Sequence, residues 1–409
     1  MEYSNLSKEL TNNLSSIIKK ENGIYFTPPS CVKNNMELLK PYMSGIKHIL
    51  EPSCGSGEFI TSLQTTFPEN VSITGLELNE TIYNSILTLN TKNVKIFCKD
   101  YLIYIPDHKY DLIIGNPPFY VMKKERVEKI YYQYFEGRPN IFILFIIKSL
   151  QLLNDNGILS FILPKNFLNC LYYDRTRNFI SNNFQILNLI ECDDKFIDTK
   201  QETIIIIVRK QHKKTINNTK YILNIHNYTI FMFENNRPNI IKLYEKSKTL
   251  SELGFTVSVG TVVWNQCKDL LTDDTTKTRL IYCSDIVDNK LTIKKYKDNN
   301  KKNYIDKEGI NYPMIVINRG YGVGKYNFNY CLINENSNYL IENHLICIQY
   351  NGLYNKETEI KNTELIKMYE NIIKSLNDKR TEQFIELYFG NNAINTTELN
   401  YILPIYYDI

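Results

Sequence analysis

The segment Asn116-Pro117-Pro118-Phe119 follows directly on an apolar run that ends at Gly115. Proline fixes its own φ at about −65° and has no N–H, so the carboxamide oxygen of Asn116 and the carbonyl oxygen of Pro117 are left as hydrogen-bond acceptors. The ring of Phe119 can lie against the face of a planar ligand. These groups suit a planar ligand with an exocyclic amine. A lone Pro-Pro pair is more often only a turn, so the flanking sequence has to decide.

A glycine-containing turn precedes this segment and follows a short apolar strand predicted over 46–50. The turn reads Glu51-Pro52-Ser53-Cys54-Gly55-Ser56-Gly57 and leads into a predicted helix over 59–67. Glycines allow close approach of the backbone, and the N–H groups at a helix start can bind an anionic group. Ile60 replaces the third glycine of the dinucleotide fingerprint, which favours a smaller, carboxylate-bearing ligand over a pyrophosphate.

Two further acids follow predicted strands. Glu77 ends an apolar strand expected over 71–76 and lies about 20 residues beyond the turn, a spacing that suits a ribose diol. Asp100 follows a strand over 94–98. The carboxyl ends of parallel strands share one edge of a sheet, so we expect Gly55, Glu77, Asp100 and Asn116 on one rim.

The elements that position these residues alternate between strands and helices. The near-continuous β-branched runs indicate strands that are buried on both faces. We therefore predict an α/β fold with a doubly wound, mainly parallel, Rossmann-like sheet. Further strands are expected over 112–114, 158–163, 186–191 and 203–208, and further helices over 82–89, 141–153 and 175–182.

The ordered set of motifs resembles the gamma-class, TaqI-like, adenine-N6 DNA methyltransferases. The resemblance runs from about residue 20 to residue 250 and continues more faintly to the C-terminus. It rests on Tyr25-Phe26-Thr27-Pro28-Pro29, the turn at 51–57, Glu77, Asp100, Asn116 to Phe119, Gly137-Arg138-Pro139-Asn140-Ile141-Phe142, Phe145, the segment 157–164 and Phe196.

The resemblance implies S-adenosyl-L-methionine as cofactor and assigns residues to its parts. Glu77 takes the ribose hydroxyls and Asp100 the adenine amine, while Tyr101 and Phe145 form apolar walls. The residues expected at the methionine end and in the turn are Thr27, Glu51, Pro52, Cys54, Gly55 and Gly57. Cys54 is read as a small pocket residue and not as a nucleophile.

The implied chemistry is methyl transfer to the N6 amine of an adenine that has left the duplex. Asn116 and Pro117 would accept the two hydrogens of that amine, and Phe119 would stack on the base and favour the developing positive charge. The resemblance places Phe196 against the same base. From the sequence alone, Phe196 is equally well explained as a core residue that leads into the strand over 203–208. The family more often has Tyr at the position of Phe119, which keeps the stacking face and lacks the hydroxyl.

Length and composition suggest two domains, which we place at 1–245 and 246–409. The first would be catalytic and the second a target-recognition domain that binds DNA, built as an irregular α+β module. Within the second, basic and aromatic residues interleave over 294–304, and a glycine-rich loop covers 318–326. The substrate-binding candidates there are Trp264, Arg319 and Lys325.

The same features predict the setting of the enzyme. Nine cysteines without paired spacing argue against disulfides and a zinc ribbon, so we expect no metal. The longest apolar stretches are far shorter than a membrane span. We expect a monomeric protein in the bacterial cytoplasm or in the replication compartment of a large DNA virus. Its partner would be double-stranded DNA, with a separate restriction endonuclease left open.

Other functions remain open at the level of sequence. RNA adenine and release-factor glutamine methyltransferases share the Asn-Pro-Pro motif, and a cytosine-N4 enzyme more commonly has Ser or Asp at the position of Asn116. A catalytically silent nucleic-acid-binding protein of this fold is the alternative from another class. The intact Glu77, Asp100 and Asn116 weigh against it.

Overall fold

The structure is a computed structural model that describes residues 2–192, 196–199, 201–211, 216–319, 326–335, 337–354, 362–388 and 394–407. The chain divides into two compact units, Met1–Arg237 and Pro238–Ile409, compared with the boundary expected after residue 245. Within the described residues, no helix is both long and apolar enough to cross a membrane.

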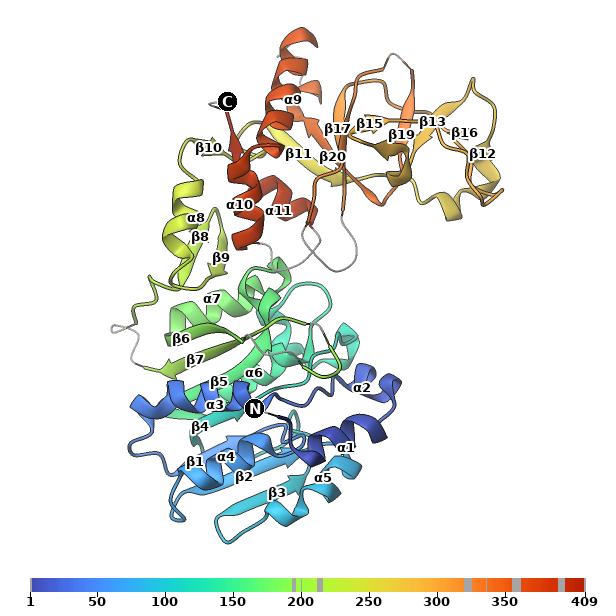
Figure 1. The fold of residues 1–409 in the computed structure, drawn as a ribbon. Helices are drawn as coiled ribbons and strands as arrows, with labels where there is room; N and C mark the ends of the chain where they lie inside the picture. The colour runs from blue at the N-terminus through green and yellow to red at the C-terminus, as the bar shows by residue number, and fades with distance from the viewer. Residues whose placement is uncertain are drawn as a thin grey trace. The chain divides into compact units, whose positions relative to one another are not determined.

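The first unit contains a seven-stranded sheet with the order β3-β2-β1-β4-β5-β7-β6 (Figure 1). Strand β7 pairs antiparallel with both of its neighbours, and the other pairs are parallel. The predicted doubly wound, mainly parallel sheet is therefore confirmed. Its strands are β1 His48–Glu51, β2 Ser72–Glu77, β3 Val94–Cys98, β4 Tyr110–Gly115, β5 Leu153–Pro164, β6 Phe184–Cys192 and β7 Thr203–Lys210.

Helices cover both faces of this sheet because side chains alternate along the buried strands. Ile205 and Ile207 belong to a core with α3 and α4, whereas Ile204 and Ile206 belong to a second core with α6 and α7. The helices are α3 Pro29–Leu39, α4 Glu58–Thr66, α5 Glu80–Ser85, α6 Ile141–Leu152 and α7 Asp174–Asn183. A 3₁₀ turn, Leu87–Leu89, replaces the end of the helix predicted over 82–89.

Two helices at the N-terminus were not predicted, because this polar segment shows little apolar periodicity. They are α1 Asn5–Asn13 and α2 Ser16–Asn22, capped by the side chains of Ser4 and Ser15. Helix α1 lies beside α5 in the first unit (Figure 1). Leu10 of α1 packs with Phe26 and Ile82 in a small apolar cluster. A hairpin, β8 Ile222–Ile225 and β9 Tyr228–Phe231, completes this unit.

The second unit is a mixture of short strands and helices. One four-stranded sheet has the order β11-β20-β17-β18, and another has the order β12-β16-β13-β19. The strands of the first sheet are β11 Phe255–Val259, β17 Met314–Asn318, β18 Tyr330–Ile333 and β20 Leu345–Tyr350. Those of the second are β12 Leu271–Thr272, β13 Thr278–Ile281, β16 Tyr304–Ile305 and β19 Tyr339–Ile341. The other elements are α8 Arg237–Leu243, β10 Ser247–Lys248, β14 Ile286–Val287, β15 Lys290–Leu291, α9 Asn362–Leu376, α10 Lys379–Tyr388, α11 Thr396–Tyr401 and β21 Ile405–Tyr406.

Candidate functional site

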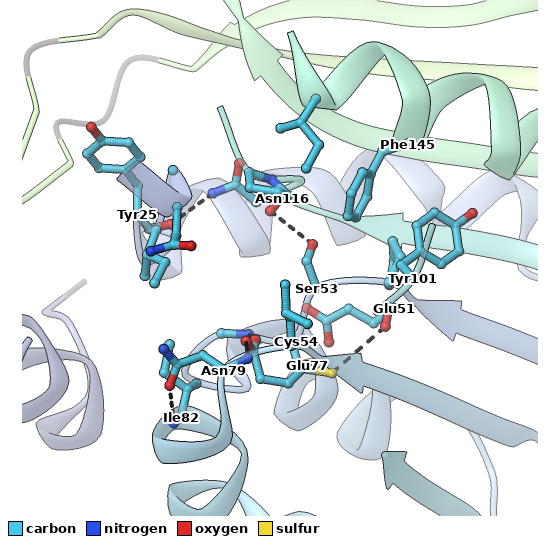
Figure 2. A pocket seen from close by; sticks show the side chains of 18 of the residues that line it. Tyr25, Glu51, Ser53, Cys54, Glu77, Asn79, Ile82, Tyr101, Asn116 and Phe145 are labelled. Carbon is cyan, nitrogen blue, oxygen red and sulfur yellow. Dashed lines mark hydrogen bonds between the residues drawn. The ribbon is translucent and has the colours of Figure 1, made fainter. Parts of the chain in front are cut away.

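A cavity of about 480 Å³ lies at the carboxyl ends of the parallel strands in the first unit. Glu51 ends β1 and Glu77 ends β2, while Asp100 and Asn116 follow the ends of β3 and β4. In Figure 2, Asn116 and Phe145 lie on one side of this cavity, and Glu77, Asn79 and Ile82 lie on the opposite side. The cavity is lined by the predicted residues Thr27, Glu51, Pro52, Cys54, Gly55, Glu77, Asp100, Tyr101, Asn116 and Phe145.

The turn between β1 and α4 needs glycine for steric reasons. Gly57 has φ +79°, and a Cβ at this position would lie 2.3 Å from Cδ1 of Leu89. The N–H groups of the turn are used differently from our expectation that they bind an anionic ligand group. The Gly55 N–H donates to Oε2 of Glu77 at 2.9 Å, and the Ile60 N–H donates to the Glu51 carboxylate. Carboxylates of the chain therefore occupy these donors.

Glu51 is a buried acid with an unused acceptor. Its side chain is 1% exposed, and no donor among the described residues reaches Oε2. Burial, and then the nearby charge of Glu77, hold the pKa of Glu51 well above its usual range. A buried carboxylate oxygen without a partner is costly, so this site favours a ligand that brings a cation or a hydrogen-bond donor.

Glu77 has a structural and a ligand-facing role in the same carboxylate. Oε1 accepts from the Asn79 N–H at 2.8 Å, in addition to the bond from Gly55 to Oε2. Asn79 in turn caps α5 by accepting from the Ile82 N–H (Figure 2). Burial raises the pKa of Glu77 above its ordinary value, although these backbone donors oppose the shift. Each carboxylate oxygen keeps a further lone pair for a ligand.

The charge and shape of the cavity fit S-adenosylmethionine. Five carboxylates line it together with one lysine: Glu51, Glu58, Glu77, Glu80, Asp100 and Lys99. This excess of negative charge suits the ammonium and sulfonium groups of the cofactor, and the carboxylates can accept hydrogen bonds from its ribose hydroxyls. The orphaned Oε2 of Glu51 is the observation that most directly calls for such a partner.

An apolar wall covers another part of the cavity, as expected for a planar ring. The rings of Tyr101 and Phe145 have centroids 4.8 Å apart, and both residues are buried. The Tyr101 hydroxyl forms a 2.8 Å hydrogen bond with Oγ of Ser149, which fixes the ring on α6. Cys54 also lines the cavity, and burial raises its thiol pKa well above the usual range, so its thiol is not activated.

Asn116 is held so that one atom of its carboxamide remains available. Nδ2 donates to the carbonyl oxygen of Tyr25 and to Oγ1 of Thr27, each at 3.1 Å. Because a carbonyl can only accept, these bonds identify Nδ2 and leave Oδ1 as the free acceptor. Oδ1 is buried and has no donor among the described residues. Ser53 Oγ donates to the Asn116 carbonyl at 3.1 Å and holds its backbone (Figure 2).

A second, smaller cavity of about 90 Å³ shares one lining residue, Tyr25, with the larger cavity. Phe119 and Phe196 line it, together with Thr199, Gln201 and Thr203. Phe119 is half-buried, and its ring meets that of Phe142 edge-on at 6.0 Å. Phe196 is buried and packs in the core with Cys192. Phe196 is therefore a core residue that also lines this cavity.

Two of the predicted site residues do not line the cavities. Pro117 is buried, and neither it nor Gly57 lines either of these two cavities. Conversely, cavity residues that were not singled out come from the N-terminal segment, the turn and the start of α5. They include Asn22, Gly23, Ser53, Ser56, Glu58, Asn79 and Ile82. Asn79 was detectable in principle, since Asn before an acid at a strand end is typical of a helix cap.

The candidates in the second unit have varied surroundings. Trp264 is half-buried, and the ammonium groups of Lys268 and Lys301 lie 5.9 Å and 6.0 Å from its ring centroid. Arg319 is half-buried, and its carbonyl accepts from the Ile394 N–H at 3.3 Å. Lys325 lies outside the described residues.

Comparison with known proteins identifies similar methyltransferases. Residues 12–197 match the family described as Eco57I restriction-modification methylase. The Type II methyltransferase M.CvrRI of Paramecium bursaria Chlorella virus XZ-6E is 25% identical over 96% of each chain. The modification methylase CviBIII of Paramecium bursaria Chlorella virus NC1A is 30% identical over 51% of this chain and 55% of its own.

A relationship at the level of fold extends further along the chain. The cryo-EM structure of a DrdV–DNA complex matches with a TM-score of 0.53 at 14% identity, covering 96% of this chain and 57% of that one. The family match falls within the unit that holds both cavities and Asn116. Residues 12–197 thus match an Eco57I-type restriction-modification methylase domain, and over 96% of its length the chain is similar to a Type II methyltransferase.

Proposed function

We propose that this enzyme methylates the N6 amine of an adenine that is turned out of double-stranded DNA. The observation that carries the proposal is Oδ1 of Asn116, which is buried and has no donor among the described residues. Asn116 and Tyr25 both line the larger cavity. Tyr25 also lines the smaller cavity with Phe119 and Phe196. A buried acceptor in an acidic pocket that shares Tyr25 with an aromatic slot suits a planar base with an exocyclic amine.

In this proposal, some residues bind the cofactor and others accept hydrogen bonds from the adenine amine. S-adenosylmethionine, when bound by Glu51, Glu77, Asp100 and the wall of Tyr101 and Phe145, supplies an electrophilic methyl group. Asn116 Oδ1 accepts one N–H of the adenine amine. The Pro117 carbonyl is assigned the other N–H from the family resemblance, although Pro117 lines neither cavity. These two acceptors draw the nitrogen lone pair out of the ring and stabilise the positive charge that develops on nitrogen.

Phe119 and Phe196 contact the target base and not the methyl donor. Phe119 stacks on the adenine and adds a cation–π contribution as charge develops. Phe196 forms the facing wall of the slot. After transfer, the methylated nitrogen loses one proton to water, so no dedicated general base is needed.

We further propose that residues 238–409 form the target-recognition unit and that the enzyme methylates specific duplex sites as a monomer. A restriction endonuclease, if one accompanies it, would act as a separate protein. Such an enzyme works where its DNA is, in a bacterial cytoplasm or a viral replication compartment. The resemblance of this chain to viral and bacterial methylases supports this setting.

The decisive experiment identifies the methylated nucleoside. Duplex DNA is treated with the purified enzyme and labelled S-adenosylmethionine, digested and separated by mass spectrometry. We expect N6-methyldeoxyadenosine, and a roughly 100-fold or greater loss of rate in Asn116→Ala with unchanged cofactor affinity. N4-methyldeoxycytidine as the product, or activity on RNA alone, would contradict the proposal.

A further inference from the structure

Helix α2 and its C-cap contact the two chain segments that carry Phe119 and Phe196. The helix ends at Gly23, whose φ is +63°, and a Cβ at this position would lie 2.5 Å from the backbone nitrogen of Phe119. Only glycine allows this approach, because a side chain would collide with backbone atoms that cannot swing away. The end of α2 thus rests directly on the segment that carries Phe119.

The same helix reaches the segment that carries Phe196 through an ion pair. Lys19 Nζ donates to Oδ2 of Asp198 at 2.8 Å and to the carbonyl oxygen of Thr11 at 2.8 Å. The Lys19 side chain is 10% exposed and that of Asp198 is 28% exposed, so the pair is largely shielded from water. Asp198 lies between Phe196 and Thr199, which both line the smaller cavity.

Helix α1 ties this arrangement to the larger cavity. Ser4 Oγ and Ser7 Oγ each donate to Oε1 of Glu58 at 2.6 Å, and Ser7 Oγ lies 2.8 Å from Ser56 Oγ. Ser56 and Glu58 line the larger cavity. The N-terminal helices therefore have fixed attachments to the cofactor turn, to the catalytic segment and to the loop of Phe196.

We infer that Lys19 and Asp198 are positioning residues that set the spacing between Phe119 and Phe196, and so the width of the slot for the extruded base. The inference rests on the proposed function, because it assigns a base to this slot. Neither residue touches the base. Without the pair, this ion-pair contact between the Phe196 loop and α2 is lost, while Gly23 still contacts Phe119.

The test follows a fluorescent base analogue placed at the target position. Duplexes carrying 2-aminopurine report on stacking of the extruded base, and single-turnover methyl transfer is measured on matched unlabelled duplexes. Lys19→Met keeps the aliphatic stem and removes the charge. We expect it to change the 2-aminopurine signal and slow methyl transfer by about tenfold, since one member of a shielded ion pair is removed. Cofactor affinity should stay within about twofold of the parent.

Three further variants separate positioning from general stability. Lys20→Met applies the same change to the neighbouring exposed lysine and should behave as the parent. Lys19→Arg retains the charge and should recover much of the rate. Asp198→Asn and the double variant complete a cycle in which the double variant should lose no more than the worse single variant. All measurements are made well below the melting temperature of each variant.

The outcomes distinguish this inference from the proposed function. Failure of the parent enzyme to methylate adenine or to give a 2-aminopurine signal would overturn the proposed function. A functional parent with Lys19→Met equal to it in signal and rate would overturn the inference alone. Strictly additive losses in the cycle would also overturn it, because the two residues would then act independently.

Discussion

Nδ2 of Asn116 lies 3.1 Å from Oγ1 of Thr27, a residue 89 positions earlier in the chain. With the carbonyl of Tyr25, this hydroxyl occupies the amide hydrogens and directs Oδ1 away from them. The orientation of the acceptor is thus set by a neighbour and not by Asn116 alone.

Removing the Thr27 hydroxyl should loosen Asn116 while leaving the acceptor in place. We expect Thr27→Val to lower kcat by about fivefold, since one net hydrogen bond contributes about 1 kcal/mol. Thr27→Ser keeps the hydroxyl and should retain the parent kcat. Steady-state kinetics with saturating cofactor test this, and equal kcat values for the two variants would remove Thr27 from the orientation of Asn116.

The buried acids should make cofactor binding and stability depend on pH in opposite directions. Burial raises the folded-state pKa of Glu51 and Glu77 above the ordinary value of 4.5. As pH falls, the folded chain takes up these protons before the unfolded chain does. The free energy of unfolding of the cofactor-free enzyme should therefore increase as pH falls through the raised pKa values. This increase reaches its full size near pH 4.5, the ordinary pKa of the group. The cationic cofactor should bind less tightly over the same range.

Glu51→Gln isolates this effect. The variant should be more stable than the parent at neutral pH, bind S-adenosylmethionine more weakly and depend less on pH. Glu80→Gln is the matched control, because Glu80 lines the same cavity but is exposed. Melting curves and titration calorimetry from about pH 5 to about pH 8 provide the comparison. Identical pH profiles for Glu51→Gln and the parent would contradict the assignment.

Phe196 should contribute its ring to base capture and its volume to the core. Phe196→Leu keeps an apolar side chain, so we expect a folded protein with nearly unchanged cofactor affinity. Loss of base stacking should reduce methyl transfer at low DNA concentration by about tenfold. Phe196→Tyr retains a ring as the control. If Phe196→Leu matched the parent in rate, only the packing role of Phe196 would stand.

Salt dependence should distinguish the lysines of the second unit. Lys301 lies 4.0 Å from the Tyr282 ring centroid and 4.4 Å from that of Tyr296, and burial lowers its pKa. Lys294 and Lys295 are exposed. If these two contact phosphates, the double change Lys294→Ala/Lys295→Ala should reduce the slope of log affinity against log salt by about 2.

Lys301→Met serves as the comparison for these surface lysines. We expect it to lower the melting temperature, because the ammonium is packed among aromatic rings, and to leave the salt slope unchanged. Binding of labelled duplex over a range of salt concentrations measures both variants. A parent-like slope for the double variant would exclude Lys294 and Lys295 as phosphate contacts.

The sequence by itself determined the sheet and the rim of the main cavity. The β-branched runs that are buried on both faces required a layered α/β core, and parallel strands bring their carboxyl ends to one edge. Glu51, Glu77, Asp100 and Asn116 follow strand ends within a few residues, so local sequence was enough to gather them. The left-handed turn at Gly57 was likewise readable, since it depends on the residue type itself.

Only the tertiary structure decided how the site is completed. Contacts that join distant segments have no local signature: the Lys19–Asp198 pair spans 179 positions, and Ser7 meets Glu58 across 51. The role of α1 and α2 could not be read from a polar segment, because their positions are set by what they pack against. The same physical reason applies to Asn116, since the side chain offers two hydrogen-bonding ends and only the folded surroundings select which one is left free.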